Sequence, residues 1–363
     1  MNRIITAVSA TPRERYTLAE RGELTLAMQV QRCGREAALA DVLYVHGATF
    51  GADLSVYFAF DGRSWADALC EGGFDAWGFD FAGYGDSQRY PAAHAGMPCD
   101  IDDASAQLRR AVAAVRARNG GRPLVLLGHS HGGTVAARHA ALQPDDVRAL
   151  VLFAPVVPRA ETARSPAAPT QSHYPLTVWA QYRRFIEDVP RGQSPVLSDA
   201  HYDAWSAAFL RSDAGAAART PPAVMTPSGP LADIAALWRG RSFYDASRIV
   251  APTLLVRGQW DSVCDDRDAA ALLSTLGAAD KLDVRIERAT HLMHLEAQRG
   301  ALHDAVNRFL LARAAEPRSA AVAPLGHNGI LAFFSTRGSS CRCHRCRSTP
   351  TSRTRSPGCR PRR

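Results

Sequence analysis

The 363-residue sequence contains no run of 18 or more apolar residues, so it offers no segment long enough to cross a membrane as a helix. Residues 1–23 also lack the continuous apolar core of a secretory signal peptide. Hydrophobic residues make up 46% and charged residues 21% of the chain, an ordinary composition that excludes wholesale disorder, a collagen and a coiled coil. We therefore expect a globular protein of the cytoplasm, without a membrane span.

Lysine and acidic residues are absent from the last 47 residues, 317–363, which contain ten arginines. The rest of the chain carries 33 basic and 35 acidic side chains, a net charge of −2. The formal charge of +8 therefore comes from this tail. Because the body is not basic, its composition argues against nucleic acid as a partner.

Cysteine is scarce in the body and concentrated in the tail. Four cysteines without motif spacing lie in the body, where we expect reduced thiols: Cys33, Cys70, Cys99 and Cys264. Four more lie in the tail: Cys341, Cys343, Cys346 and Cys359. With His344, the run CRCHRC resembles a metal-ligand cluster, but no second half stands at a recognised zinc spacing. We expect a disordered basic tail over residues 317–363, with zinc binding as the alternative. For the body of the chain we expect no metal and no organic cofactor.

Short apolar runs alternate with helical patterns along most of the body. Near-continuous apolar runs are typical of strands covered on both faces in a parallel sheet. Six are expected, at residues 42–45, 74–81, 123–127, 147–153, 252–256 and 282–286. Helices are expected at residues 100–118, from just after 130 to about 142, and over a last stretch ending near 315. The alternation predicts an α/β fold with a mostly parallel, doubly wound sheet.

One segment breaks this alternation. Residues 156–247 hold 10 of the 22 prolines and three of the six tryptophans, with helical patches at 174–188 and 198–211 but no clear strand. We interpret the segment as a helical insertion between two strands. The predicted domains are a core of residues 1–155 and 248–316, the insertion 156–247, and the tail 317–363.

The strongest chemical signal is the stretch GHSHGG at residues 128–133, which follows the third apolar run directly. A Gly-x-Ser-x-Gly pattern alone is only suggestive, but its place between a strand and a helix makes it specific. The glycines permit a sharp turn that exposes Ser130 at the carboxyl edge of the sheet, at a helix N-terminus where the dipole favours negative charge. Ser130 is the candidate nucleophile; the alternative is a glycine-rich turn with a serine N-cap.

A serine nucleophile needs a base, and the base needs an acid to orient it. The candidate acid is Asp261, just past the fifth apolar run, and the alternative is a turn-forming aspartate. Two histidines after the last run compete as the base. We favour His291 because it stands nearest the strand end, whereas His294 is expected to pack or to cap a helix.

Two backbone amides are expected to stabilise negative charge on the substrate oxygen. One belongs to His131, the residue after the candidate nucleophile. The other belongs to Ala48, in the loop that follows the first apolar run, where Gly47 lets the chain bend close to the site. The alternative for this loop is a plain glycine turn.

The stretches HGATF, DFAGYGDS, GHSHGG, RGQWD and ATHLMHLE occur in the order and spacing of the α/β-hydrolase superfamily, which the sequence resembles over roughly residues 25–315. The resemblance implies the hydrolase fold, catalytic residues in the chain order Ser, Asp, His, and a helical cap over residues 156–247. His131, where many members carry an apolar residue, and the tail depart from the family pattern. Epoxide hydrolases and haloalkane dehalogenases of this fold carry an aspartate at the position of the nucleophile. Ser130 at that position therefore argues against both classes.

These residues predict a serine hydrolase that cleaves a carboxylic ester through an acyl-enzyme intermediate. The expected substrate is a small or medium-sized apolar acyl or aryl ester, or a monoacyl lipid. The expected pocket residues are His46, Thr49, Trp179 and Trp260. The aromatic residues of the insertion either face the cleft or form the insertion's own core. Alternatives with the same triad are an amidase or aminopeptidase, a thioesterase and a carbon–carbon bond hydrolase; another is a non-catalytic ligand-binding member.

Overall fold

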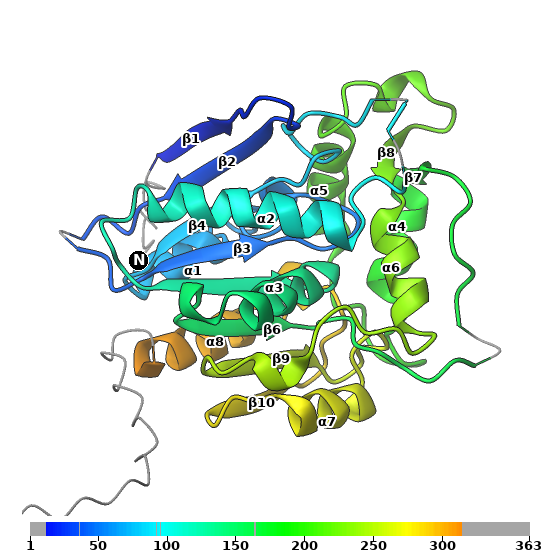
Figure 1. Cartoon of the computed structure of the whole chain (residues 1–363). Coiled ribbons are helices and arrows are strands. Elements are labelled where there is room, and N and C mark those ends of the chain that lie inside the picture. Colours follow the sequence, from blue (N-terminus) through cyan, green and yellow to red (C-terminus); the bar gives the residue numbers. More distant parts are fainter. Residues whose placement is uncertain (1–11, 36, 92, 95, 163–164, 314–363) are drawn as a thin grey trace, which may run out of the picture. The chain divides into compact units, whose positions relative to one another are not determined.

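Figure 1 shows the computed structural model of the chain, which describes residues 12–35, 37–91, 93–94, 96–162 and 165–313. Among these residues eight strands form one sheet, in the order β1-β2-β4-β3-β5-β6-β9-β10. Their bounds are β1 Arg13–Leu18, β2 Leu26–Gln31, β3 Asp41–Val45, β4 Asp75–Phe79, β5 Leu124–His129, β6 Ala149–Phe153, β9 Thr253–Gly258 and β10 Lys281–Ile286. The six strands from β4 to β10 along this order pair in parallel, and β2 and β1 extend the β4 edge through antiparallel pairings.

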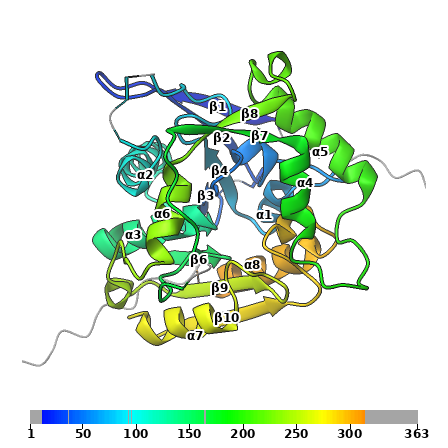
Figure 2. The ribbon, with the colours of Figure 1, turned by 90° about the vertical axis from the view of Figure 1, so that its right-hand side faces the viewer.

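The helices cover both faces of this sheet. In Figures 1 and 2, α2 and α3 lie on one face and α1 and α8 on the other. The helices of the sheet region are α1 Trp65–Glu71, α2 Ile101–Arg116, α3 His131–Leu142, α7 Asp266–Thr275 and α8 Arg299–Arg313. Short 3-10 turns occur at Ala52–Leu54, Pro144–Asp146, Ala216–Ala218, Ala246–Arg248 and Met293–Leu295. The predicted α/β fold with a mostly parallel sheet is confirmed.

All six expected strands are present in the sheet, and β1 and β2 are additional to the prediction. The sequence of β1, RERYTL, is largely exposed and contains no apolar run. Strand β2 is buried, but its sequence LAMQVQ mixes two glutamines with apolar residues. Strand β1 is defined by its pairing with β2, and β2 also pairs with β4. No local sequence pattern predicts such pairing.

The inserted segment, residues 156–247, connects β6 to β9 and lies across the carboxyl edge of the parallel strands, as Figure 2 shows face-on. Its helices are α4 Val178–Ile186, α5 Asp199–Arg211 and α6 Gly229–Leu237. Beside these helices the segment contains two strands, where no clear strand was expected: β7 His173–Thr177 and β8 Ala223–Pro227 pair antiparallel. Each of these five-residue strands contains a proline, which weakens the strand signal but is tolerated in a two-stranded ribbon.

Clusters of buried hydrophobic side chains hold these layers together. Every residue of β3, β4, β5 and β6 is buried. The inserted segment has its own core of Phe185, Trp205 and Phe209, all completely buried. The Trp205 ring packs edge-on against Phe50 of the loop after β3, with ring centroids 5.1 Å apart, and its indole N–H donates to the Leu54 carbonyl at 2.9 Å. These contacts fix the segment over the sheet edge.

Within the described ranges no helix is long and apolar enough to span a bilayer. The four body cysteines are free thiols. The same ranges hold no group of three or more His, Cys, Asp or Glu side chains placed to bind a metal ion. The expectations for the tail, residues 317–363, including the cluster of Cys341, Cys343, His344, Cys346 and Cys359, lie outside the described residues.

Candidate active site

Ser130 lies in the turn between β5 and α3 with φ 56° and ψ −124°, a conformation that residues with a side chain rarely adopt. The surrounding glycines are required by close backbone contacts. A Cβ atom on Gly128 would lie 2.5 Å from the Gly132 carbonyl oxygen. A Cβ atom on Gly132 would lie 2.3 Å from the carbonyl oxygens of Val45 and His46. The Gly-x-Ser-x-Gly spacing thus follows from the passage of this turn against the end of β3.

His291 connects Ser130 to Asp261. Its Nε2 lies 2.9 Å from the Ser130 Oγ, and its Nδ1 lies 3.1 Å from both carboxylate oxygens of Asp261. All three residues are buried. Because an ionised carboxylate only accepts, Nδ1 donates to Asp261 and Nε2 is left to accept the hydroxyl proton of Ser130. The structure thus brings together the three residues expected as nucleophile, base and acid.

Neighbouring groups hold this chain of hydrogen bonds in place. The amides of Val263 and Cys264 donate to Asp261 Oδ1 at 2.8 and 3.0 Å. The ring of His129 donates from Nε2 to the backbone carbonyl of His291 at 3.1 Å. Burial lowers the pKa of His129 well below its usual value. The His129 ring is therefore neutral and adds no positive charge beside His291.

A buried carboxyl, missed by the sequence analysis, supports the loop that carries His291. Glu296 accepts a hydrogen bond from the Thr290 amide at 3.0 Å and another from the Thr290 hydroxyl. Burial raises the pKa of Glu296 to about 7. His294, the alternative base, lies in the same loop. Its ring packs against the rings of Phe50 and His129 instead of reaching Ser130.

The amides of Ala48 and His131 both border the Ser130 turn. Around Gly47 the orientation of the peptide is fixed, because the His46 ring donates from Nδ1 to the Gly47 carbonyl at 2.8 Å. A trans peptide directs its N–H opposite to its carbonyl, so the Ala48 N–H points away from His46. The Tyr84 hydroxyl holds the next carbonyl, that of Ala48, at 2.6 Å. His131 is the first residue of α3, where amides have no partner within the helix.

A family model described as alpha/beta hydrolase fold matches residues 42–298. The chain is an α/β-hydrolase. Similar solved structures include a peroxisomal α/β-hydrolase of Saccharomyces cerevisiae, with 16% identity and a TM-score of 0.58 over 87% of this chain and 93% of that one. Est1E of Butyrivibrio proteoclasticus, solved with ferulic acid bound, has 16% identity and a TM-score of 0.55 over 83% and 100% of the two chains.

A monoacylglycerol lipase of Paleococcus ferrophilus has 20% identity and a TM-score of 0.50, covering 80% of this chain and 99% of that one. At such identities these structures are alike in fold alone. No curated protein matches this hydrolase in sequence.

The hydrolase has a cavity of about 340 Å³ beside Ser130 and His291. This volume stands at the small end of the range for small-molecule sites. The core contributes to its walls Gly47, Ala48, Thr49, Phe50, His129, Val263 and Leu292. The inserted segment contributes Pro166, Ala167, Pro169, Gln181, Arg184, Leu231, Ile234 and Trp238. The site is therefore mostly apolar and is closed by residues from the insertion.

Of the four expected pocket residues, Thr49 lines this cavity and the other three do not. His46 is completely buried, and its ring also accepts a hydrogen bond from the Phe81 amide at 3.0 Å. Trp179 is 66% exposed on the outer side of α4. Trp260 lies beneath the Arg288 guanidinium. The expectation that His46, Trp179 and Trp260 line the pocket is therefore wrong. The position of a residue in the sequence does not reveal which way its side chain points from a loop or a helix.

The aromatic residues of the insertion mostly form its own core, which was one of the two expectations for them. Phe185, Trp205 and Phe209 belong to this core, whereas Trp238 lines the cavity. The sequence analysis did not single out Gln181 and Arg184, the two polar residues that the insertion contributes to the wall. Their spacing of three residues on a helix is too common to mark a site.

Proposed function

We propose that this α/β-hydrolase is a serine hydrolase that cleaves carboxylic esters through an acyl-enzyme intermediate. The supporting observation is the unbroken chain of hydrogen bonds from Asp261 through His291 to Ser130, beside an apolar cavity. This is the relation of acid, base and nucleophile that acyl transfer requires. The inserted segment, residues 156–247, acts in this proposal as the cap of the site.

In the proposed reaction His291 Nε2 takes the proton of Ser130 as Oγ attacks the ester carbonyl carbon. Asp261 stabilises the resulting imidazolium. The carbonyl oxygen, now negative, accepts hydrogen bonds from the amides of Ala48 and His131. His291 then protonates the departing alcohol, which leaves the acyl group on Ser130. Water, deprotonated by His291, attacks the acyl-enzyme and releases the acid.

The lining of the cavity supports a small or medium-sized acyl or aryl ester as the substrate. Leu231, Ile234 and Trp238 of the insertion and Leu292 of the core present apolar surface to it. Its volume of about 340 Å³ argues against a bulky polymer as the part that enters. Est1E, of the same fold, was solved with ferulic acid, an aryl acid, in the structure.

The test is hydrolysis of p-nitrophenyl esters of increasing acyl length by the wild type and by Ser130→Ala. We expect the variant to lose at least ~10⁴-fold in kcat, because the nucleophile is removed. A fluorophosphonate probe should label the wild type and not the variant. Labelling without hydrolysis of any ester would show a reactive serine with another substrate class. Absence of labelling would favour the non-catalytic ligand-binding alternative.

His291→Gln and His294→Gln form a matched pair that separates the two candidate bases. His291→Gln should lose activity to nearly the same extent as Ser130→Ala, because members of one triad act as a unit. His294→Gln should retain most of the wild-type kcat, since its ring makes no contact with Ser130. The reverse ranking would assign the base to His294.

A further inference from the structure

Gln181 stands out on the wall of the cavity. Its side chain lies on α4, is only 1% exposed and borders the cavity. Within the described part of the chain the side-chain Oε1 has no hydrogen-bond partner. Buried polar groups in native proteins are nearly always paired, because an unpaired one loses its hydration without compensation. A group that is unpaired and borders an active-site cavity is therefore placed to bind a ligand.

Arg184 follows Gln181 by one helical turn and borders the same cavity. Residues three apart on a helix share a face, so the amide and the guanidinium are neighbours on this wall. The guanidinium offers N–H donors, while Gln181 offers an acceptor. Together they can bind a group that both accepts and donates hydrogen bonds.

The charges around Arg184 disfavour an anion as that group. Arg184 already forms an ion pair with Glu187 on the next turn of the chain. The carboxylates of Asp188 and Asp261 also lie close enough to act on its charge. The positive charge of Arg184 is thus already compensated by one paired carboxylate and influenced by two more, which disfavours a further carboxylate on the substrate.

We infer that Gln181 and Arg184 form a polar subsite for a neutral hydrogen-bonding group of the substrate, such as a secondary amide or a hydroxyl. The inference rests on the proposed ester hydrolysis and narrows its substrate class. The substrate is an ester whose chain carries this group within reach of α4, while its alkyl part contacts Leu231 and Ile234. Gln181 and Arg184 determine specificity and take no part in the chemical step.

The test compares three p-nitrophenyl esters with acyl chains of about equal length: pentanoyl, N-acetylglycyl and hemisuccinyl. The pentanoyl chain is apolar, the N-acetylglycyl chain is neutral and carries an amide, and the hemisuccinyl chain is anionic. The wild type is compared with Gln181→Met, which keeps an unbranched side chain of similar volume without the amide. Taking the ratio of kcat/KM between two esters in each protein, and then comparing proteins, cancels the intrinsic reactivity of each ester.

A second series holds the acyl group as butanoyl and varies the alcohol between pentanol and N-acetylethanolamine. It covers the case in which the polar group lies on the leaving side. We expect the wild type to favour the amide-bearing ester in one series. Gln181→Met should lower that preference about tenfold, measured as the ratio of kcat/KM between the amide-bearing and the apolar ester.

Thermal unfolding separates binding from a structural role. Removing the buried, unpaired Oε1 of Gln181 relieves its desolvation penalty, so Gln181→Met should melt no lower than the wild type. If that variant does not fold, Arg184→Gln, at a partly exposed side chain, gives the same comparison of esters. A lower melting temperature with unchanged ester preference would overturn the inference.

Two further outcomes would also overturn it. Equal preferences of wild type and variant in both series would show that no polar subsite exists on α4. A wild-type preference for the hemisuccinyl ester that Arg184→Gln abolishes would show an anion site instead. If the wild type hydrolyses none of these esters, the proposed function itself fails, and the inference fails with it.

Discussion

At the scale of single residues, the turn around Ser130 leaves no room for a side chain at Gly132. We expect Gly132→Ala to lose activity and to lower the melting temperature by many degrees, because the new methyl group would collide with the carbonyl oxygens of β3 and its loop. Gly300 is the matched control, since a Cβ atom there meets nothing within 4 Å. Gly300→Ala lies in α8 and should be neutral or stabilising by about 0.5–1 kcal/mol.

The measurement is differential scanning calorimetry of both glycine variants together with p-nitrophenyl ester hydrolysis. An active, normally stable Gly132→Ala would show that the turn has more freedom than its contacts indicate. Equal losses in the two variants would point to a general effect of alanine, not to the collision.

Glu296 should make the stability of the protein depend on pH. Its pKa is about 7 in the folded chain, against 4.5 for a solvated glutamate. The folded state therefore retains a proton that the unfolded state releases. The stabilisation from this group is complete below about pH 4.5 and is lost as the pH rises through 7. Its size is at most ~3 kcal/mol, at 1.36 kcal/mol for each pKa unit.

Glu296→Gln removes this titration while keeping an oxygen to accept from Thr290. We expect the wild type to lose stability relative to the variant between pH 5 and pH 8. Urea unfolding of both proteins at the two pH values measures the difference. Parallel changes in the two proteins would assign the pH dependence to other buried acids, such as Asp80, whose pKa burial raises to about 6.

The sequence was sufficient to pick out Ser130, Asp261 and His291 as candidates that the structure then brings into contact, because each stands shortly after the end of a recognisable strand. Parallel strands bring their carboxyl ends to one edge, so residues far apart in the chain meet there. Gln181 and Glu296 carry no such mark. Both are polar side chains that become buried by segments distant in the sequence. No local pattern in a single sequence predicts this burial. His46 shows the opposite error, since its polar ring is used inside the loop and not in the pocket.

At the scale of elements, a buried hydrogen bond joins the insertion to the Ser130 turn. The His131 ring, at the start of α3, donates from Nε2 to Asp233 of α6 at 2.8 Å. Both side chains are buried. The unusual histidine noted in the family pattern therefore acts as a contact between the two layers.

Asp233→Leu should destabilise the protein by about 1–3 kcal/mol, because it leaves the buried Nε2 of His131 without a partner. Asp233→Asn keeps an acceptor oxygen and should cost less than 1 kcal/mol. Urea unfolding of the two variants checks the ranking, and ester hydrolysis shows whether a loosened α6 also lowers kcat. Equal stabilities for both variants would mean that the contact contributes nothing to the fold.

Elements were predictable where one segment carried its own signal. Helix α2, for example, lies within the predicted range 100–118 and begins after Asp100, whose side chain accepts hydrogen bonds from the amides of Asp102 and Asp103. Strands β7 and β8 could not be predicted, because each is short, contains a proline and exists only through its partner in the other. Sheet edges and ribbons of this kind depend on tertiary pairing more than on propensity.

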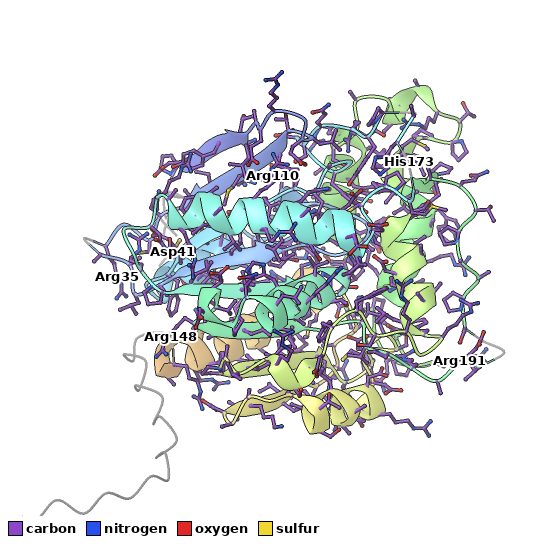
Figure 3. All side chains as sticks on the ribbon, in the orientation of Figure 1. Arg35, Asp41, Arg110, Arg148, His173 and Arg191 are labelled. Atoms are coloured by element: carbon purple, nitrogen blue, oxygen red, sulfur yellow. The ribbon has the colours of Figure 1, made fainter. Side chains whose placement is uncertain are left out.

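At the scale of the whole molecule, an ion-pair network lies at the sheet end remote from the insertion. Figure 3 places Asp41 of this network on the side of the molecule away from His173 of the insertion. Arg122 makes two hydrogen bonds of 2.9 Å to Asp41 and one of 3.1 Å to Asp75. Asp41 is completely buried and also accepts from the Trp77 indole at 2.6 Å.

Arg122→Leu should cost about 3 kcal/mol of stability, since it strips a buried carboxylate of its counter-charge. Arg15→Leu, which breaks an exposed pair with Asp86, should cost less than 1 kcal/mol. Both variants should keep wild-type KM and kcat well below their melting temperatures, because neither residue is near the cavity. The ranking in urea unfolding is the check, and a large change in KM would contradict the separation of stability from catalysis.

The position of the insertion has a consequence for how the chain folds. Strands β6 and β9 are neighbours in register, with Phe153 opposite Val256, although about 100 residues separate them along the chain. Joining them closes a long loop, and its entropic penalty must be met before the pairing contributes any stability. The N-terminal half of the sheet, β3 to β6, needs no such closure across the insertion. During synthesis it can assemble first and present its open β6 edge to β9, and until then that edge is the part of the protein most exposed to association with other chains.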